Sequence, residues 1–276
     1  MSVPDFLFIG PSKTASTWIY KALDEHPSLR LPRAKDVYYF DQFYERGFDW
    51  YCRQFPKLGD GELTGEFSHD YIYNPDALDR IAADLPGVKL IICARNPYER
   101  TQSGIKFLRR NGYGFEPITV LVEKHTELIE GSLYGRNLQL LLDRFDREQI
   151  LILDYAQLQD DPEGFVAKIS NFLGIDFYST DLFYKKVNPS RDARNRYLSF
   201  VVKRLSLLAR SIGFGSLVGM IKMNVFVNLI LFKKPADGNI LSREDTRFLQ
   251  QYFDEDIDLF CRLSGVDYSE WKVGDE

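Results

Sequence analysis

The sequence contains little cysteine and histidine, and this scarcity excludes several classes of protein. Only three cysteines occur in 276 residues, Cys52, Cys93 and Cys261. Because they are odd in number and far apart, the sequence excludes a disulfide framework and a C-x-x-C metal site. We predict reduced thiols of the core, which is consistent with a reducing compartment. No group of ligand-type residues has metal-site spacing, so we predict no metal.

The start of the sequence shows no leader-like pattern, and the composition shows no excess of positive charge. No basic stretch followed by an apolar run precedes the first predicted strand, so we expect no signal peptide and a cytoplasmic location. The 35 Lys and Arg residues are outnumbered by 40 Asp and Glu residues, which gives a formal net charge of −5. We therefore expect no nucleic-acid partner, although a local basic cluster can still bind a small anion.

What the sequence does contain is an alternation of apolar strands and amphipathic helices. Strands are expected near 5–9, 62–68, 88–97 and 149–158, and helices near 16–26, 75–86, 98–110, 132–145 and 162–175. This alternation predicts an α/β fold with a P-loop-like central parallel sheet flanked by helices. We expect a single domain over residues 1–276, with its core at about 5–180.

One segment departs from this pattern. The first part of residues 199–232 carries Lys203 and Arg210 among apolar positions, and the second part is strongly apolar but interrupted by Lys222 and three glycines. Residues 211–232 nearly reach the ~20 apolar residues of a spanning helix. A membrane span, an interfacial amphipathic anchor and a buried or partner-facing helical hairpin all stay open. We favour a helical insertion at about 197–235, which forms an oligomer or touches the inner face of the membrane, followed by a C-terminal helix at about 242–265.

A polar loop follows the first strand. Residues 10–17 read GPSKTAST and lead directly into the first predicted helix. Backbone N–H groups at such a helix start bind phosphate, while Lys13 adds a point charge and three hydroxyls add donors. The loop does not match G-x-x-x-x-G-K-[ST], because the second glycine is absent. A plain strand–helix turn with a surface lysine remains the alternative.

A second polar stretch follows the strand near 88–97. Residues 94–107 read ARNPYERTQSGIKF, with Arg95 at the strand end and Ser103 in the following helix. We interpret Arg95 and Ser103 as two groups that bind one phosphate, the arginine through a bidentate charge-assisted bond. A surface arginine and an ordinary helical serine are the alternative. Two anion sites at the ends of neighbouring parallel strands indicate a ligand with two separated phosphates.

Together these stretches resemble motifs of the sulfotransferases that use 3′-phosphoadenosine 5′-phosphosulfate (PAPS). Residues 13–17 are similar to the K-T-G-T-T of their 5′-phosphosulfate loop, and residues 95–103 match the R-N-P-x-x-R-x-x-S of their 3′-phosphate motif. Residues 34–56 resemble the K-E-P-x-F-F-D segment of heparan sulfate and other glycan sulfotransferases. Residues 65–71 and 150–176 resemble their G-E-x-(S/T)-P-x-Y and their strand, D-P and F-L-G helix. A bacterial member of this carbohydrate branch is the expected identity.

The resemblance implies a mechanism. An acceptor hydroxyl attacks the sulfur of PAPS in line, and adenosine 3′,5′-bisphosphate (PAP) leaves. Lys13 would stabilise the leaving group, and Arg95 and Ser103 would hold the 3′-phosphate. Further implied contacts to the nucleotide come from Thr14, Ala15, Ser16, Thr17, Trp18, Tyr134, Arg191 and Arg194. For the last two, a solvated charged loop is the alternative.

The general base has two candidates. Asp36 matches the family's glutamate in K-E-P-x-F-F, whereas His69 replaces a proline, so no family role carries over to it. Their alternatives are a solvated or ion-paired loop carboxylate and a packed loop residue. Glu66 matches a family glutamate and is expected to orient a lysine or the acceptor. The lysine that often follows it is Phe67 here, so the acceptor contacts of the glycan enzymes do not carry over.

The expected acceptor is a hydroxyl of a small molecule or glycan, on a sugar, glycolipid or glycosylated natural product. A lipid or polyketide alcohol is the alternative, and the net negative charge disfavours highly sulfated chains. A P-loop kinase would need a glycine before Lys13 and an acidic strand end, for which Asp154 is an ambiguous candidate. A non-catalytic, nucleotide-binding, membrane-associated scaffold that docks through residues 199–232 is the alternative outside enzymes.

Overall fold

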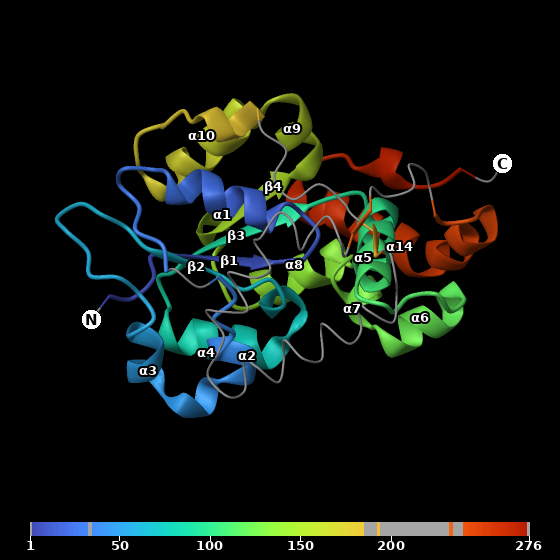
Figure 1. Cartoon of the computed structure of the whole chain (residues 1–276), viewed down its shortest axis with the longest axis horizontal. Helices are drawn as coiled ribbons and strands as arrows, with labels where there is room; N and C mark the ends of the chain where they lie inside the picture. The colour runs from blue at the N-terminus through green and yellow to red at the C-terminus, as the bar shows by residue number, and fades with distance from the viewer. Residues whose placement is uncertain (1, 33–34, 185–191, 194–231, 234–239, 275–276) are drawn as a thin grey trace. The chain divides into compact units, whose positions relative to one another are not determined.

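A computed structural model gives the fold, and it describes residues 2–32, 35–184, 192–193, 232–233 and 240–274 (Figure 1). Two compact units are present. The first unit comprises Met1–Arg100, Ile129–Asn188 and Leu249–Glu276, and the second comprises Thr101–Leu128 and Pro189–Phe248.

The first unit is built on a four-stranded parallel sheet with the order β2-β1-β3-β4. Its strands are β1 (Phe6–Gly10), β2 (Gly65–Phe67), β3 (Lys89–Ala94) and β4 (Ile150–Asp154). The two inner strands, β1 and β3, are almost wholly buried, as their continuous apolar sequences predict. Because all strands are parallel, their carboxyl ends lie at one edge of the sheet. The predicted α/β fold with a central parallel sheet is confirmed.

Helices connect these strands. Those expected near 16–26, 75–86, 132–145 and 162–175 are present, whereas the strand expected near 149–158 ends at Asp154 and a helix follows it directly. The first unit contains α1 (Ser16–Asp24), α2 (Tyr39–Gln42), α3 (Phe48–Cys52), α4 (Pro75–Asp84), α8 (Tyr134–Leu142), α9 (Tyr155–Asp160) and α10 (Pro162–Leu173). It also contains the 3₁₀ helices η1 (Tyr44–Arg46), η2 (Tyr71–Tyr73), η3 (Arg147–Gln149), η4 (Asp181–Tyr184) and η5 (Ser269–Trp271). The helices α5 (Pro97–Arg110), α7 (Glu127–Glu130) and α14 (Arg243–Ser264) each contribute residues to both units.

The second unit has few described elements. They are the helix α6 (Ile118–Lys124), parts of the shared helices, and the short strands β5 (Asp192–Ala193) and β6 (Phe232–Lys233). The two strands pair in antiparallel orientation. The predicted insertion at about 197–235 lies almost entirely outside the described residues. Within the part of the chain that is described, no helix combines the length and the apolar character needed to cross a bilayer.

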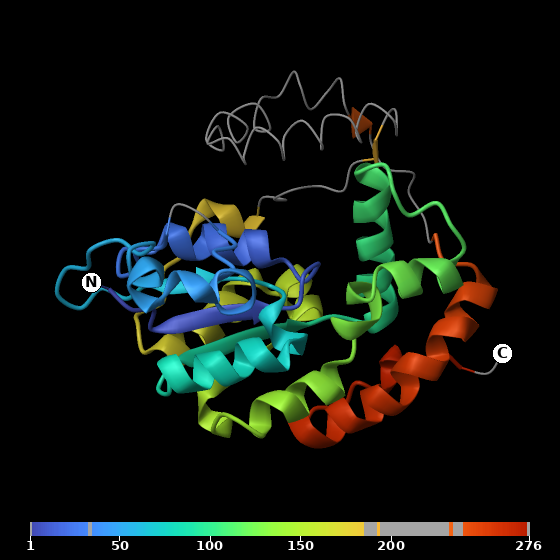
Figure 2. The ribbon, with the colours of Figure 1, turned by 90° about the horizontal axis from the view of Figure 1, so that it is seen from below.

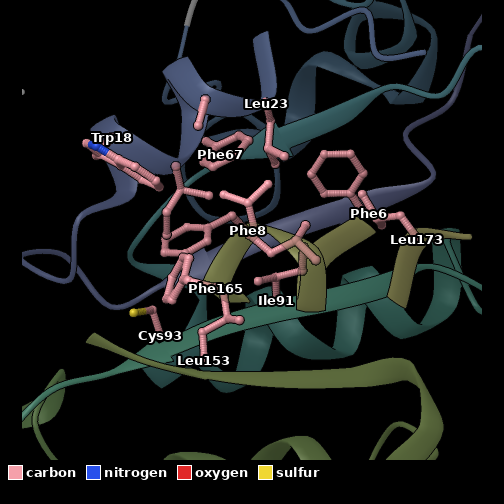
Figure 3. Packing of buried hydrophobic residues seen from close by; sticks show 14 of the residues in the cluster. Phe6, Phe8, Trp18, Leu23, Phe67, Ile91, Cys93, Leu153, Phe165 and Leu173 are labelled. Carbon is pink, nitrogen blue, oxygen red and sulfur yellow. The ribbon is translucent and has the colours of Figure 1, made fainter. Parts of the chain in front are cut away.

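Alternation along β1 divides the core between the two faces of the sheet. Phe6 and Phe8 belong to a buried cluster that includes residues of α1 and α10 (Figure 3). The intervening residues Leu7 and Ile9 are equally buried and point to the opposite face, on which α4 lies (Figure 2). The sheet is therefore covered on both faces.

The helix boundaries follow from local sequence signals. The Asn74 side chain accepts a hydrogen bond from the Ala77 N–H at 3.2 Å, and Pro75 occupies the first position of α4. The Asp161 side chain caps α10 in the same way, and the helix ends at Gly174 in a left-handed conformation. These are the residue types that favour helix starts and ends.

Phe8, one of the two buried phenylalanines of β1, provides a test of the core. Phe8 is 0% exposed and stacks on Phe67 with ring centroids 5.3 Å apart. We expect Phe8→Ala to lower the free energy of unfolding by about 3–5 kcal/mol, because the cavity cannot collapse fully. Urea denaturation measures the change. Phe177→Ala is the control, since Phe177 is 46% exposed; similar losses in both variants would contradict the described core.

Candidate active site

The site begins where β1 ends, at Gly10. This residue has φ of +118°, and a Cβ at this position would overlap the carbonyl oxygen of His69. Any other residue would push the two backbones apart, so glycine is required here. The close approach brings the loop after β1 next to the segment after β2.

The loop between β1 and α1 has an unusual backbone. Lys13 and Ala15 adopt φ values of 73° and 64°, in the left-handed region that non-glycine residues rarely occupy. Ala15 is also the cap residue of α1, and no side-chain bond caps the helix there. The N–H groups of Ser16 and Thr17 precede the first hydrogen bond of the helix, which the Trp18 N–H makes to the Ala15 carbonyl, and they lie at the positive end of the helix. Strain of this kind clusters at binding sites, so the loop fits the predicted anion site.

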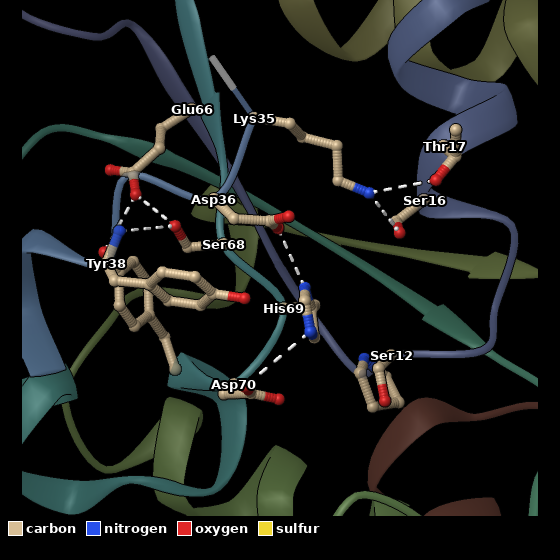
Figure 4. A network of polar contacts seen from close by, with 12 residues as sticks. Ser12, Ser16, Thr17, Lys35, Asp36, Tyr38, Glu66, Ser68, His69 and Asp70 are labelled. Carbon is tan, nitrogen blue, oxygen red and sulfur yellow. Dashed lines mark hydrogen bonds and ion pairs between the residues drawn. The ribbon is translucent and has the colours of Figure 1, made fainter. Parts of the chain in front are cut away.

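The three hydroxyls of the loop do not all face the same way. Thr14 is fully buried, and its hydroxyl donates to the Pro11 carbonyl at 2.7 Å, so it holds the loop itself. The Ser16 and Thr17 hydroxyls instead accept hydrogen bonds from the Lys35 ammonium, at 2.8 and 3.2 Å (Figure 4). These two hydroxyls lie at the start of α1 and are the ones placed to meet an anion there.

Trp18 was predicted to contribute to nucleotide binding. Its indole ring packs in the core, with centroids 6.3 Å from the Phe165 ring and 5.9 Å from the Phe183 ring. The backbone N–H of Trp18 donates to the Ala15 carbonyl at 2.8 Å. Trp18 therefore anchors α1 against the core.

The second anion motif begins at Arg95, directly after β3. Its guanidinium donates to the Lys13 carbonyl at 3.3 Å, pairs with Glu99 at 3.1 Å and lies 4.3 Å from the centre of the Tyr155 ring. The Tyr134 hydroxyl accepts a hydrogen bond from the Arg95 N–H at 3.1 Å. Tyr134 thus orients the backbone of Arg95.

Arg100 is a residue that sequence reasoning missed. It is only 2% exposed, and its guanidinium donates to the Ser12 carbonyl at 3.0 Å and to the Ser132 hydroxyl at 2.9 Å. A third bond, at 3.4 Å, reaches the Ser12 hydroxyl. Arg100 therefore ties the loop after β1 to the helix after β3. The sequence signal that could have found Arg100 is its position as the second arginine of the R-N-P-x-x-R pattern, for which no role was predicted.

Three other predicted contacts are not placed at this site. Ser103 lies on α5 within the second unit, so its approach to the phosphate bound by Arg95 stays a prediction. Arg191 and Arg194 lie outside the described residues.

Across the described ranges, no group of three or more His, Cys, Asp or Glu side chains is arranged to hold a metal ion.

The two candidate bases, predicted separately, are in direct contact. His69 Nδ1 lies 3.0 Å from Asp36 Oδ1, and His69 Nε2 lies 3.6 Å from Asp70 Oδ2 (Figure 4). Asp36 itself has φ of 66°, and its N–H donates to the Phe67 carbonyl at 2.9 Å. The side chains of His69 and Asp36 are 22% and 31% exposed, so a bound molecule can reach them.

Glu66 has a different role from the one expected. It is 1% exposed and accepts hydrogen bonds from the hydroxyls of Tyr51, Tyr71 and Ser68. The Ser68 hydroxyl in turn accepts from the Tyr38 N–H at 3.2 Å. Glu66 therefore connects the segments that carry Asp36 and His69, and the described structure shows no lysine on its carboxylate.

The burial of Glu66 predicts a dependence of stability on pH. Burial raises the pKa of its carboxyl above the ordinary value of 4.5, although the Ser68, Tyr51 and Tyr71 hydroxyls lower it. Because the pKa is higher in the folded state than in the unfolded state, the protonated carboxyl of Glu66 stabilises the fold. This stabilisation is fully present below about pH 4.5 and is lost as pH rises through the pKa of the folded state.

Glu66→Gln removes this titration. We expect the free energy of unfolding of the wild type to fall relative to that of Glu66→Gln as pH rises from about 4.5 toward 7.5. Urea denaturation at a series of pH values measures the difference. Glu45→Gln, at an exposed position, serves as the control. If the free energies of unfolding of wild type and Glu66→Gln change equally with pH over this range, the assigned burial of the carboxyl is wrong.

Comparisons with known proteins agree with these motifs. A family model described as "Sulfotransferase domain" matches residues 3–192. The membrane-associated sulfotransferase kil1 of Dictyostelium discoideum is 31% identical over 147 residues, which cover 49% of this chain and 31% of that protein. Human heparan sulfate glucosamine 3-O-sulfotransferase 6 is 29% identical over 186 residues, which cover 64% of this chain and 54% of that protein. The chain thus spans a third to about half the length of these relatives.

Solved structures share the fold over nearly the whole chain. A sulfotransferase from Alicyclobacillus acidocaldarius has a TM-score of 0.69 at 19% identity, with 98% of this chain and 99% of that one covered. Mouse sulfotransferase SULT7A1 complexed with PAP has a TM-score of 0.55 at 18% identity, with 95% and 88% covered. At these identities the likeness concerns the fold, which matches the predicted one.

Proposed function

The chain belongs to the sulfotransferase family, and on this premise we propose that it transfers a sulfuryl group from PAPS to a hydroxyl of a carbohydrate acceptor. The observation that carries the proposal is the contact between the two anion motifs. The Arg95 guanidinium reaches the Lys13 carbonyl at 3.3 Å, so the two motifs adjoin, and this supports a single nucleotide with two separated phosphates as their shared ligand.

The residues that would hold PAPS follow from their positions. The first N–H groups of α1, together with the Ser16 and Thr17 hydroxyls and the Lys13 ammonium, would hold the 5′-phosphosulfate. Arg95 and Ser103 would hold the 3′-phosphate, and the contacts of Arg191 and Arg194 to it stay predictions. When bound, PAPS supplies a sulfuryl group on a leaving group that carries negative charge.

The proposed reaction exchanges one bond for another. The acceptor oxygen bonds to sulfur, the bond from sulfur to the bridging oxygen breaks, and PAP leaves with that electron pair. The proton of the acceptor hydroxyl passes to the pair formed by Asp36 and His69. Lys13 stabilises the charge that develops on the bridging oxygen.

Within the pair, Asp36 is the proposed base, and His69 is its partner through Nδ1. The reverse assignment has His69 Nε2 take the proton while Asp36 orients the ring, as in other His–Asp pairs. In both assignments the contact at 3.0 Å makes the two residues act together.

The acceptor side of the site is acidic. The carboxylates of Asp36, Asp70 and Asp41 all raise the pKa of Tyr38, after the larger effect of its burial. An acidic surface disfavours sulfated chains and favours a neutral hydroxyl, which supports a neutral sugar, glycolipid or glycosylated natural product. A lipid or polyketide alcohol, also neutral, is the second candidate acceptor.

The proposal is tested by transfer of radioactive sulfur from ³⁵S-labelled PAPS to a panel of neutral and sulfated oligosaccharides and apolar alcohols. We expect label on a neutral acceptor. Asp36→Asn should lower the rate by about 10²–10⁴-fold, and Lys13→Ala by about 10²–10³-fold. Asp60→Asn is the matched control, because it makes the same change at an exposed position, and it should leave the rate unchanged.

Two results would contradict this assignment. Full activity of Asp36→Asn would remove Asp36 from the reaction, and a larger loss in His69→Gln than in Asp36→Asn would make His69 the base. Binding of PAP without transfer to any hydroxyl would instead favour the nucleotide-binding scaffold.

A further inference from the structure

Lys35 has no assigned role, yet its side chain reaches the phosphate loop. Its Nζ donates to Ser16 Oγ at 2.8 Å and to Thr17 Oγ1 at 3.2 Å (Figure 4). Both hydroxyls lie in the first turn of α1. The lysine comes from the opposite side of the site, from the segment that continues into Asp36.

The position of this ammonium is electrostatically unfavourable without a bound anion. The start of α1 is the positive end of the helix dipole, and a cation there is repelled. Across the described residues, no carboxylate oxygen lies within ion-pair distance of Lys35 Nζ. Burial lowers the pKa of Lys35, while the charge of Asp36 raises it. An anion bound against the first turn of α1 would offset both costs.

We propose that Lys35 binds the sulfuryl oxygens of PAPS and stabilises the charge on them during transfer. This inference rests on the proposed function. The 5′-phosphate belongs on the α1 side, and the acceptor belongs on the side of Asp36. In an in-line transfer the sulfuryl group lies between the two. Lys35 connects these two sides, since its ammonium contacts Ser16 and Thr17 and its backbone precedes Asp36.

A purely structural role makes a different prediction. If Lys35 only fastened its own segment to α1, its loss would disturb the loop and weaken every ligand of the loop equally. A lysine that binds the sulfuryl group distinguishes PAPS from PAP, because PAP lacks that group. The ratio of the two affinities therefore separates the two roles without any acceptor.

The experiment is calorimetric titration of PAP and of PAPS into wild type, Lys35→Met and Lys35→Arg. Lys21→Met is the matched control, because Lys21 lies exposed on α1. We expect Lys35→Met to bind PAP within about twofold of wild type and to bind PAPS at least about tenfold more weakly, the size of one charge-assisted bond. Lys35→Arg should recover part of the PAPS affinity, and Lys21→Met should match wild type.

The outcomes are separable. Equal losses for both nucleotides, or no loss for either, would overturn the role of Lys35 while leaving the proposed function intact. Failure of the wild type itself to bind either nucleotide would overturn the proposed function and this inference with it. Thermal unfolding of each variant shows whether Lys35→Met is folded, and the PAPS affinity of Lys35→Arg tests the role if it is not.

Discussion

The buried guanidinium of Arg100 is the interaction on which the site depends. Its bonds to the Ser12 carbonyl and the Ser132 hydroxyl fix the loop after β1 against the start of α5. A buried cation destabilises the fold unless its N–H donors have acceptors. If the loop moved away, the Arg100 guanidinium would lose the Ser12 carbonyl as an acceptor, and this loss holds the loop in place. Gly10 imposes the complementary constraint, because only glycine lets the His69 backbone pass so close. Together they hold three strand ends in one arrangement.

This arrangement gives the site two sides of opposite charge. Lys13, Arg95 and the first turn of α1 form the side that fits an anionic donor, and Asp36 and Asp70 flank His69 on the other. In the proposed reaction, such a division separates the binding of the nucleotide from the activation of the acceptor hydroxyl. The net charge of the chain, −5, is compatible with the proposed anion site, because the charges on the two sides are separated. The buried Glu66 contributes to neither side directly, but it holds the segments of the acidic side together.

Much of the fold could be predicted, because its signals are local. Apolar runs determine where β1 and β3 lie. Capping residues determine where helices begin, as Asn74 does for α4 and Asp161 for α10. The segment at 38–55 could not be assigned. Its short helices are held by aromatic packing between distant positions, such as Tyr39 stacked on Tyr51 at 4.5 Å, rather than by a helical period. The site was partly predictable for a related reason. Its residue types were recognisable, but the contacts of Lys35, Arg100 and the Asp36–His69 pair depend on how β1, β2 and β3 lie side by side.

The central claim is that the two anion motifs recognise the two ends of one nucleotide. Calorimetric titration of PAP and of AMP into wild type and Arg95→Ala tests it most directly, since the two ligands differ only in the 3′-phosphate. PAP should bind wild type about 100-fold more tightly than AMP, and Arg95→Ala should remove that advantage. Equal affinities of wild type for PAP and AMP, or an advantage that survives in Arg95→Ala, would contradict the assignment of the second motif to a 3′-phosphate.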